Sequence, residues 1–100
     1  MSSLEKITDW EERGRSAGYS VSRLAKACSV TERTLLRYFL IAFEDTPHEW
    51  LNKLRQRDAT AALNDRKSVK ETAAIVNYTR ASSLSRSYKK FYRIPPSLSQ

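Results

Sequence analysis

The sequence predicts an all-α fold in which two helix-turn-helix lobes are joined by a long linker helix, with about seven helices in all. A helix-turn-helix pattern occurs twice, about 48 residues apart, at residues 24–39 and 72–88. In each copy an Ala precedes a Thr by six residues, and an apolar pair spaced i, i+4 follows that Thr. Gly and Pro number only 2 and 3 of the 100 residues, which argues against disorder and against a β-rich fold cut by turns. We expect one domain over residues 1–100, with a first lobe at 1–45, a linker helix at 46–63 and a second lobe at 64–100.

The first lobe is expected to open with an amphipathic helix. Ser2 or Ser3 can cap this helix, which should fray by Gly14. The residues expected on its buried face are Leu4, Ile7 and Trp10. Residues 14–18 contain two Gly and are expected to form a loop.

The first helix-turn-helix follows this loop. Ser20 or Ser22 caps a short helix. Its apolar side is formed by Val21, Leu24, Ala25 and Cys28. Residues 29–30 form the turn, and Thr31 caps a second helix that runs to about Phe43. The residues expected to be buried by this helix are Leu35, Phe39 and Phe43.

The linker helix has the clearest start in the chain, because Thr46 is a favoured N-cap and Pro47 suits the first helical position. Nothing interrupts the helix up to Leu63. Its side chains available for packing are Trp50, Leu51, Leu54, Ala59, Ala62 and Leu63.

The second lobe repeats the plan of the first. Ser68 and Glu71 have the spacing of a capping box that opens a short helix. The residues expected to face inward from this helix are Val69, Thr72, Ala73 and Val76. Asn77 stands where the turn needs a left-handed residue. The last helix is expected from about Arg80 to Tyr92, packed through Leu84, Tyr88 and Phe91, and stopped by Pro95 and Pro96.

The charge distribution indicates a polyanionic partner. The chain holds 18 Lys and Arg against 11 Asp and Glu, a net charge of +7. Residues 80–93 contain five cations and no acid, whereas residues 5–12 contain four acids and one Lys. The basic end is therefore expected to face the polyanion. No apolar run is long enough for a membrane span or a signal core, so a cytosolic or nucleoid-associated protein is expected.

Beyond these features, the chain resembles the AraC/XylS family of bacterial transcription regulators over about residues 20–98. The segments that carry the resemblance are 24–39, 46–63 from Thr46-Pro47 to Leu63, 68–91 from Ser68 to Phe91, and 94–97. The resemblance implies an all-helical DNA-binding domain with two lobes, whose recognition helices enter successive major grooves on one side of a duplex. Many relatives also carry a ligand-sensing domain, and because Met1 leads straight into the first expected helix, none is expected within these 100 residues. The chain is either a short stand-alone regulator or the DNA-binding part of a longer one.

The sequence departs from the family pattern at several positions. Gly is usual in the family where this chain has Glu44, Asn77 and Arg93, and an aromatic residue followed by Arg is usual where it has Ser99-Gln100. The family also shows polar or basic side chains where this chain has three aliphatic ones. These are Leu36, Leu40 and Ile41, which are expected to form a small apolar patch on the first recognition helix.

Candidate base contacts lie on the two recognition helices. Arg33 and Arg37 share a face one turn apart, and Arg can grip guanine O6 and N7 with two hydrogen bonds. The positions that the family pattern implies are Arg33, Leu36, Arg37, Ala81, Ser82, Ser85 and Arg86. Leu36 has nothing to touch in a groove except a thymine methyl group, so the two lobes are not expected to read DNA equally well.

Phosphate contacts are expected from helix N-termini and from the basic end of the chain. Thr31 and Thr79 are interpreted as N-terminal residues of the recognition helices, where hydroxyl and backbone donors can bind phosphate. Arg80, Lys89, Lys90 and Arg93 would add positive charge. The alternative interpretation of Thr31 and Thr79 is that they are only helix caps. The alternative interpretation of Arg33 and Arg37 is that they are solvated surface residues.

The remaining distinctive residues have structural explanations. Arg55 is expected to bind a carbonyl or an acid between the lobes, and Trp10 and Trp50 are expected to pack. The single His, His48, and the single Cys, Cys28, have no companion ligands, so neither a metal nor a cofactor is expected. With a single His and a single Cys, the chain also offers few residues from which to build a catalytic group of nucleophile, base and orienting acid, which argues against an enzyme.

Two functions are consistent with the sequence. The first is a DNA-binding domain that regulates transcription by recognising specific double-stranded sequences, as a monomer on DNA. The alternative is a protein-interaction module that docks RNA polymerase or another regulator through Leu36, Leu40 and Ile41, with weak or vestigial DNA binding.

Overall fold

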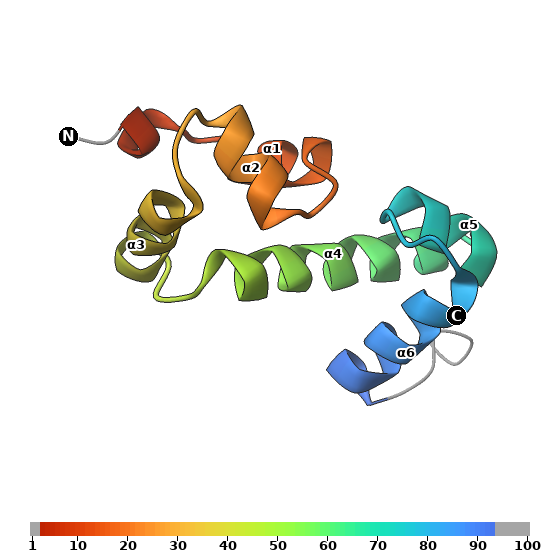
Figure 1. The fold of residues 1–100 in the computed structure, drawn as a ribbon. Coiled ribbons are helices and arrows are strands. Elements are labelled where there is room, and N and C mark those ends of the chain that lie inside the picture. The colour runs from red at the N-terminus through yellow and green to blue at the C-terminus, as the bar shows by residue number, and fades with distance from the viewer. Residues whose placement is uncertain (1–2, 94–100) are drawn as a thin grey trace. The chain divides into compact units, whose positions relative to one another are not determined.

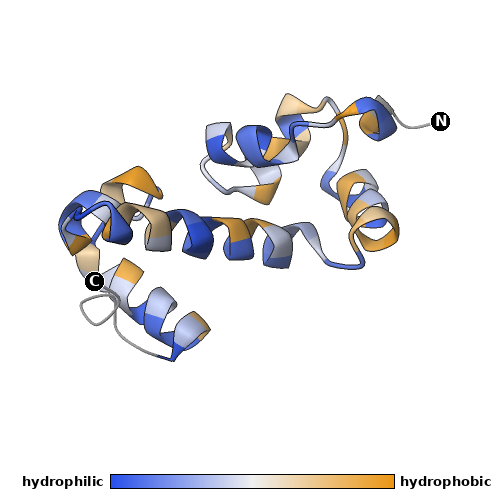
Figure 2. Ribbon diagram, turned by 180° about the vertical axis from the view of Figure 1, so that it is seen from behind, coloured by the Kyte–Doolittle hydropathy of each residue, from blue (hydrophilic) through white to orange (hydrophobic). Residues whose placement is uncertain are grey.

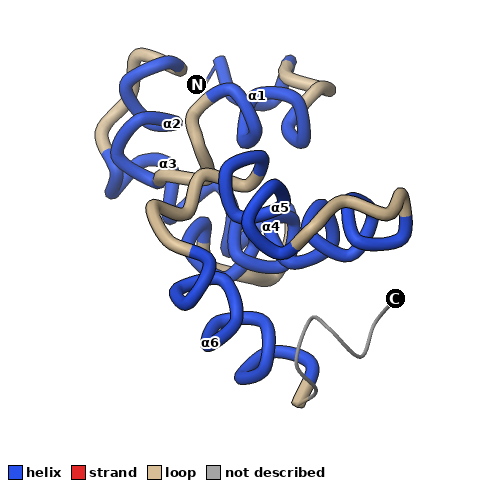
Figure 3. The backbone as a smooth tube through the Cα atoms, turned by 90° about the vertical axis from the view of Figure 1, so that its right-hand side faces the viewer, coloured by secondary structure: helices blue, strands red, loops and turns tan. Residues whose placement is uncertain are grey.

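The computed structural model describes residues 3–93 and contains only helices in that range (Figures 1 and 3). In chain order these are η1 (Ser3–Lys6), a 3-10 helix, and the α-helices α1 (Trp10–Ser16), α2 (Val21–Ala27), α3 (Glu32–Ala42), α4 (Pro47–Asn64), α5 (Val69–Ile75) and α6 (Ala81–Tyr92). The predicted all-α class is confirmed. The chain forms two compact units, Met1–Leu54 and Arg55–Gln100, and the boundary falls inside α4.

The first unit is built around an aromatic cluster. The ring of Phe39 on α3 lies edge-on to Trp10 of α1, with 4.9 Å between centroids, and to Trp50 of α4 at 5.4 Å. Phe43 closes the cluster at 4.8 Å from Phe39. The fully buried aliphatic side chains beneath it are Leu4, Leu24, Leu35 and Leu51. The predicted packing roles of both Trp residues are confirmed for this unit.

The start of the chain differs from the single helix that was predicted. Leu4 and Trp10 are both buried, but they lie in two helices separated by residues 7–9. The break falls at Thr8 and Asp9, two residue types of low helix propensity. Asp9 takes the N-cap position of α1, and its carboxylate binds Arg13 at 2.9 Å.

Gly14 does not end the first helix, contrary to the prediction. It lies inside α1, which continues to Ser16, and it is buried. A Cβ at this position would stand 2.9 Å from Leu51 Cδ2 and 3.0 Å from Leu54 Cδ2. Gly14 is therefore needed for the close approach of α1 to α4, and the loop begins only at Ala17.

Side-chain caps set most of the remaining helix starts as predicted. Ser20, Thr31 and Ser68 accept hydrogen bonds from backbone N–H groups three residues later, which begins α2, α3 and α5. Thr46 does the same for α4, accepting from the N–H of Glu49 at 3.2 Å. The capping box is complete, because Glu71 also accepts from the backbone N–H of Ser68 at 3.1 Å.

The second unit packs α5 and α6 against the second half of α4. Its largest fully buried apolar side chains are Leu63, Val76, Leu84 and Tyr88. Figure 2 shows hydrophobic and hydrophilic residues mixed along every helix, as expected for amphipathic elements. Phe91 does not pack as predicted: it is 39% exposed, and Tyr92 occupies the inner position, with its ring 4.5 Å from Tyr88. Pro95 and Pro96, which were predicted to stop α6, lie outside the described residues.

None of the helices in residues 3–93 is long and apolar enough to cross a membrane.

Candidate nucleic-acid interface

The turns of the two helix-turn-helix motifs, α2–α3 and α5–α6, begin in the same way. The N–H of Val30 donates to the carbonyl of Ala25 at 3.0 Å, and 48 residues later Tyr78 donates to Ala73 at 2.7 Å. Ser29 and Asn77, one residue before each donor, have left-handed φ values of 57° and 64°. The left-handed residue predicted at Asn77 is confirmed, and the turn explains why the pattern occurs twice.

The separation in sequence between equivalent residues of the two motifs increases from 48 to 49 after the turn. Thr31 is the N-cap of α3, whereas Arg80, 49 positions later, is the N-cap of α6. The buried residues of the two helices follow this longer spacing, as the pair Leu35 and Leu84 shows. Thr79 therefore precedes the cap, and its expected place at the helix N-terminus is wrong. The extra residue in the second turn was hidden because both copies contain a Thr near the same point.

The outward face of α3 mixes two cations with three aliphatic side chains. Arg33 and Arg37 are both exposed. Leu36, Leu40 and Ile41 are 38%, 48% and 84% exposed, so the predicted apolar patch is present on the surface of this unit.

The outward face of α6 is polar and strongly basic. Ser82 and Arg86 are exposed, and Ala81 and Ser85 are half-buried. Towards the end of the helix an open depression is lined by Arg86, Lys89, Lys90 and Arg93. No acid occurs between residues 80 and 93, so this surface has a positive potential.

A spacing of 49 residues pairs the outward faces of α3 and α6. Arg37 corresponds to Arg86, which is the same cation at the same place on each helix. The other pairs differ: Leu36 corresponds to Ser85, Leu40 to Lys89 and Ile41 to Lys90. Three outward positions are thus apolar in the first motif and polar or basic in the second.

The N-termini of the two helices also differ. The hydroxyl of Thr31 accepts from the N–H of Thr34 at 3.1 Å and lies 3.0 Å from the Thr34 hydroxyl, and Glu32 adds a negative charge to the first turn. Arg80 makes no side-chain cap, and the first turn of α6 has no acid. An anion is therefore better accommodated at the start of α6 than at the start of α3.

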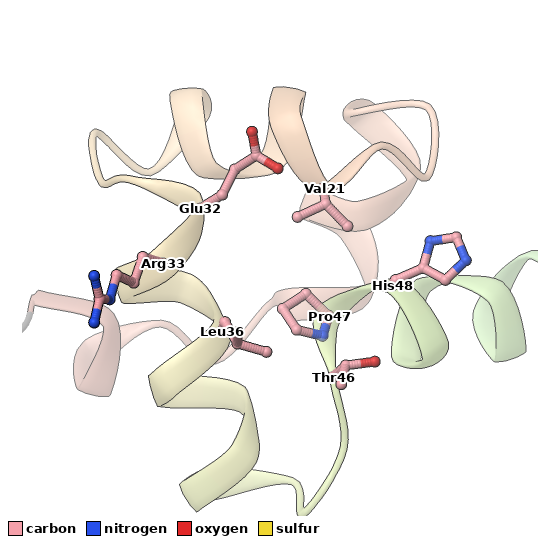
Figure 4. A pocket seen from close by; sticks show the side chains of 7 residues that line it. All are labelled: Val21, Glu32, Arg33, Leu36, Thr46, Pro47 and His48. Carbon is pink, nitrogen blue, oxygen red and sulfur yellow. The ribbon is translucent and has the colours of Figure 1, made fainter.

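A hollow lies beside the patch on α3 (Figure 4). Its lining residues are Val21, Glu32, Arg33, Leu36, Thr46, Pro47 and His48. Leu36 points towards Pro47 within it, while Arg33 points away. His48 is exposed there, and no group of three or more potential metal ligands occurs in residues 3–93. Cys28 is a free thiol, half-buried against the core rather than fully buried.

Arg55 fixes the turn of the second motif. Its Nε donates to the carbonyl of Val76 at 2.8 Å, its Nη2 donates to that of Asn77 at 2.6 Å, and its guanidinium lies 3.5 Å from the centroid of the Tyr78 ring. The predicted carbonyl bonding is confirmed, but these bonds lie within the second unit rather than between the lobes.

A buried polar network that the sequence reasoning missed lies next to Arg55. Gln56 is fully buried, and its Nε2 donates to the hydroxyls of Tyr78 at 3.0 Å and Ser87 at 2.9 Å. The network joins the turn and α6 to α4. The burial of Gln56 could have been predicted from the sequence, because Gln56 shares an i, i+3, i+7 stripe with Ala59 and Leu63, both of which are buried.

Two solved structures have the same fold. The C-terminal domain of the two-component response regulator yesN from Fusobacterium nucleatum is 20% identical, with a TM-score of 0.81 over 96% of this chain and 95% of that chain. A transcriptional regulator from Chromobacterium violaceum, described as an AraC-type DNA-binding domain-containing protein, is 17% identical, with a TM-score of 0.68 over 92% and 93%. A search of curated proteins finds no match.

The sequence also matches a protein family directly. The family, described as a helix-turn-helix domain, matches residues 24–98, which include the first motif from Leu24 onwards, the whole of α4 and the second motif. The family is a class of DNA-binding regulator domains and not a class of enzymes. With three quarters of its length in this match, the chain belongs to the AraC-type helix-turn-helix family of DNA-binding transcription regulators.

Proposed function

We propose that this chain recognises specific sequences in double-stranded DNA by inserting α3 and α6 into successive major grooves. The observation that carries the proposal is the equivalence of Arg37 and Arg86. Both are exposed, both lie on the outward face of the second helix of a helix-turn-helix, and they are 49 positions apart. A recognition helix enters the groove with the N-terminal half of this face.

Base reading is assigned to the first two turns of each recognition helix. Arg33 and Arg37 on α3 and Arg86 on α6 can each bind guanine through two hydrogen bonds, which discriminates against other bases by about 1–3 kcal/mol. The smaller contacts are assigned to Leu36 on α3 and to Ala81, Ser82 and Ser85 on α6.

Phosphate binding is assigned to residues around these helices. Thr31 caps α3, and Thr79 and Arg80 precede α6, where backbone N–H groups and the helix dipole favour an anion. Lys89, Lys90 and Arg93 continue the basic surface of α6. Six to eight neutralised phosphates would make log K fall with log salt at a slope of about −5 to −7.

The chain is proposed to act as a monomer on DNA. Each chain carries two reading helices, and α4 is one uninterrupted helix of 18 residues that belongs to both units. At 1.5 Å per residue this helix is about 27 Å long. A dimer is not needed to present two recognition helices to one duplex.

Selection from random duplex DNA at two salt concentrations tests the proposal. We expect one enriched sequence with two half-sites, and a steep loss of affinity with salt. Arg37→Ala and Arg86→Ala should each relax selectivity at one half-site. Arg37→Lys and Arg86→Lys are the matched controls: they keep the charge and the salt slope but lose the two-pronged contact with guanine. Unchanged selectivity in Arg86→Ala would contradict the assignment of α6.

A further inference from the structure

The patch on α3 is the surface feature that the proposed phosphate and guanine contacts leave unexplained. Leu36, Leu40 and Ile41 are exposed, although the equivalent positions of α6 hold Ser85, Lys89 and Lys90. Exposed aliphatic groups gain nothing from water, so three of them together on one outward face indicate a surface that is covered in use.

The neighbours of the patch restrict what can cover it. Arg33 and Arg37 lie on the same outward face as the patch. Ile41 lies one helical turn after Arg37, and Leu40 lies one turn after Leu36. The covering surface must therefore present negative charge and apolar groups within one helix width. A major groove that contains thymine does so, since phosphates line its edges and the C5-methyl group of thymine projects into it.

We infer that α3 reads thymine methyl groups through Leu36, with Leu40 extending the apolar contact, so that recognition of the α3 half-site depends on thymine methyl groups more strongly than recognition of the α6 half-site. The inference rests on the proposed function and specifies a base in one of the two half-sites of the DNA. Leu36 is placed for this contact because it lines the hollow with Val21 and Pro47, where a methyl group can be removed from water (Figure 4).

The comparison with α6 supports a division of labour between the motifs. Polar Ser85 offers no apolar surface to a methyl group, and Lys89 and Lys90 supply charge where α3 has Leu40 and Ile41. Sequence-independent affinity should therefore come mainly from α6, and methyl-dependent selectivity from α3.

Replacing thymine with deoxyuridine tests the inference, because the change removes only the methyl group and leaves base pairing intact. In the duplex recovered by selection, the half-site of α3 is identified as the one whose selectivity Arg37→Ala relaxes. We expect affinity to fall about fourfold for each contacted methyl removed from that half-site. The same replacement in the half-site of α6 should change affinity by about twofold or less.

Leu36→Ser supplies the matched variant, since it introduces the residue that the chain itself uses at position 85. Leu36 is already 38% exposed, so the folded protein should be retained, and circular dichroism checks this. The variant should bind thymine and deoxyuridine duplexes equally.

Three outcomes would overturn the inference while leaving specific DNA binding intact. The deoxyuridine duplex could bind as tightly as the original, or Leu36→Ser could keep its sensitivity to the methyl group. The patch could also prove to be a contact between chains, in which case sedimentation would show a dimer that Ile41→Lys dissociates. Failure of the selection to return any sequence would instead contradict the proposed function.

Discussion

Arg55 on α4 donates a hydrogen bond of 2.6 Å from Nη2 to the carbonyl of Asn77, the left-handed residue in the turn of the second motif. A second bond from the same guanidinium, of 2.8 Å, binds the carbonyl of Val76. The geometry of the turn that leads into α6 therefore depends on a side chain of α4.

Replacing Arg55 should destabilise the second unit. Arg55→Ala removes two charge-assisted hydrogen bonds, a part-buried one to the carbonyl of Val76 and an exposed one to that of Asn77. The expected loss is about 1.5–3 kcal/mol in the free energy of unfolding. Urea denaturation followed by circular dichroism measures the loss. Arg55→Lys keeps the charge but cannot reach both carbonyls as a planar fork, so it should recover only part of the stability. Full stability in Arg55→Ala would show that the carbonyl bonds contribute nothing.

Glu44→Gly should stabilise the first unit. Glu44 has a φ of 55°, a conformation in which a Cβ is crowded and glycine is not. Relief of this strain exceeds the entropy that glycine adds to the unfolded chain, so a net gain of about 0.5–1 kcal/mol is expected. Thermal unfolding measures the gain. Glu44→Ala, which removes the same carboxylate but keeps the Cβ, should show none of it.

Gly14→Ala should destabilise the protein even though Ala is the better helix former. The added Cβ would meet Leu51 and Leu54, which are 1% and 3% exposed and so cannot swing away. Overpacking of this kind costs about 1–3 kcal/mol, against about 1 kcal/mol gained from helix propensity. Ser16→Ala, at an exposed position of the same helix, is the comparison and should be neutral or slightly stabilising. A more stable Gly14→Ala protein would contradict the close packing of α1.

The contribution of Glu71 to stability should depend on pH. Hydrogen bonds from Ser68, from its backbone N–H first and its side chain second, hold the pKa of the Glu71 carboxyl below its usual value. Since the folded pKa is the lower one, the stabilisation is present above the unfolded pKa and is lost as pH falls through the folded value. Wild type should thus exceed Glu71→Gln in stability at pH 7, and the difference should shrink towards pH 3. An equal difference at both pH values would exclude the ionised capping box.

Removing a Lys from α6 and adding a Lys to α3 should change the salt dependence of DNA binding in opposite directions. Lys89→Ala removes one proposed phosphate contact, so the slope of log K against log salt should become shallower by about 0.9. Leu40→Lys places a cation at the equivalent position of α3 and should make it steeper by about the same amount. Binding titrations at several salt concentrations measure both. If neither variant alters the slope, these positions do not meet phosphate.

Local chemistry predicted most helix starts, because a capping side chain acts within three residues of itself. Thr31, Thr46 and Ser68 were identified from the sequence and cap as expected, and of the two candidates Ser20 and Ser22 it is Ser20 that caps α2. The errors arose where distant residues decide the outcome. Gly14 was interpreted as a helix end, since its packing against Leu51 and Leu54 cannot be read from neighbouring residues.

The candidate interface was predictable in composition but not in register. The exposed cations of both recognition helices and the aliphatic patch followed from periodicity and from the family resemblance. The displacement of Thr79 from the cap did not, because it depends on one additional residue in the turn. The burial of Gln56 could have been predicted from its stripe with Ala59 and Leu63, but its hydrogen-bond partners, Tyr78 and Ser87, could not, because they are more than 20 positions away.

The change of spacing from 48 to 49 residues within the turn determines how the two motifs can be recombined. A chimaera that transplants 81–92 in place of 32–43 joins equal lengths after the turn and keeps each core side chain at its own depth. A cut made ahead of the turn carries the additional residue along and changes the length of the turn in the first motif. Engineered regulators with new combinations of reading helices should therefore be spliced at the helix cap.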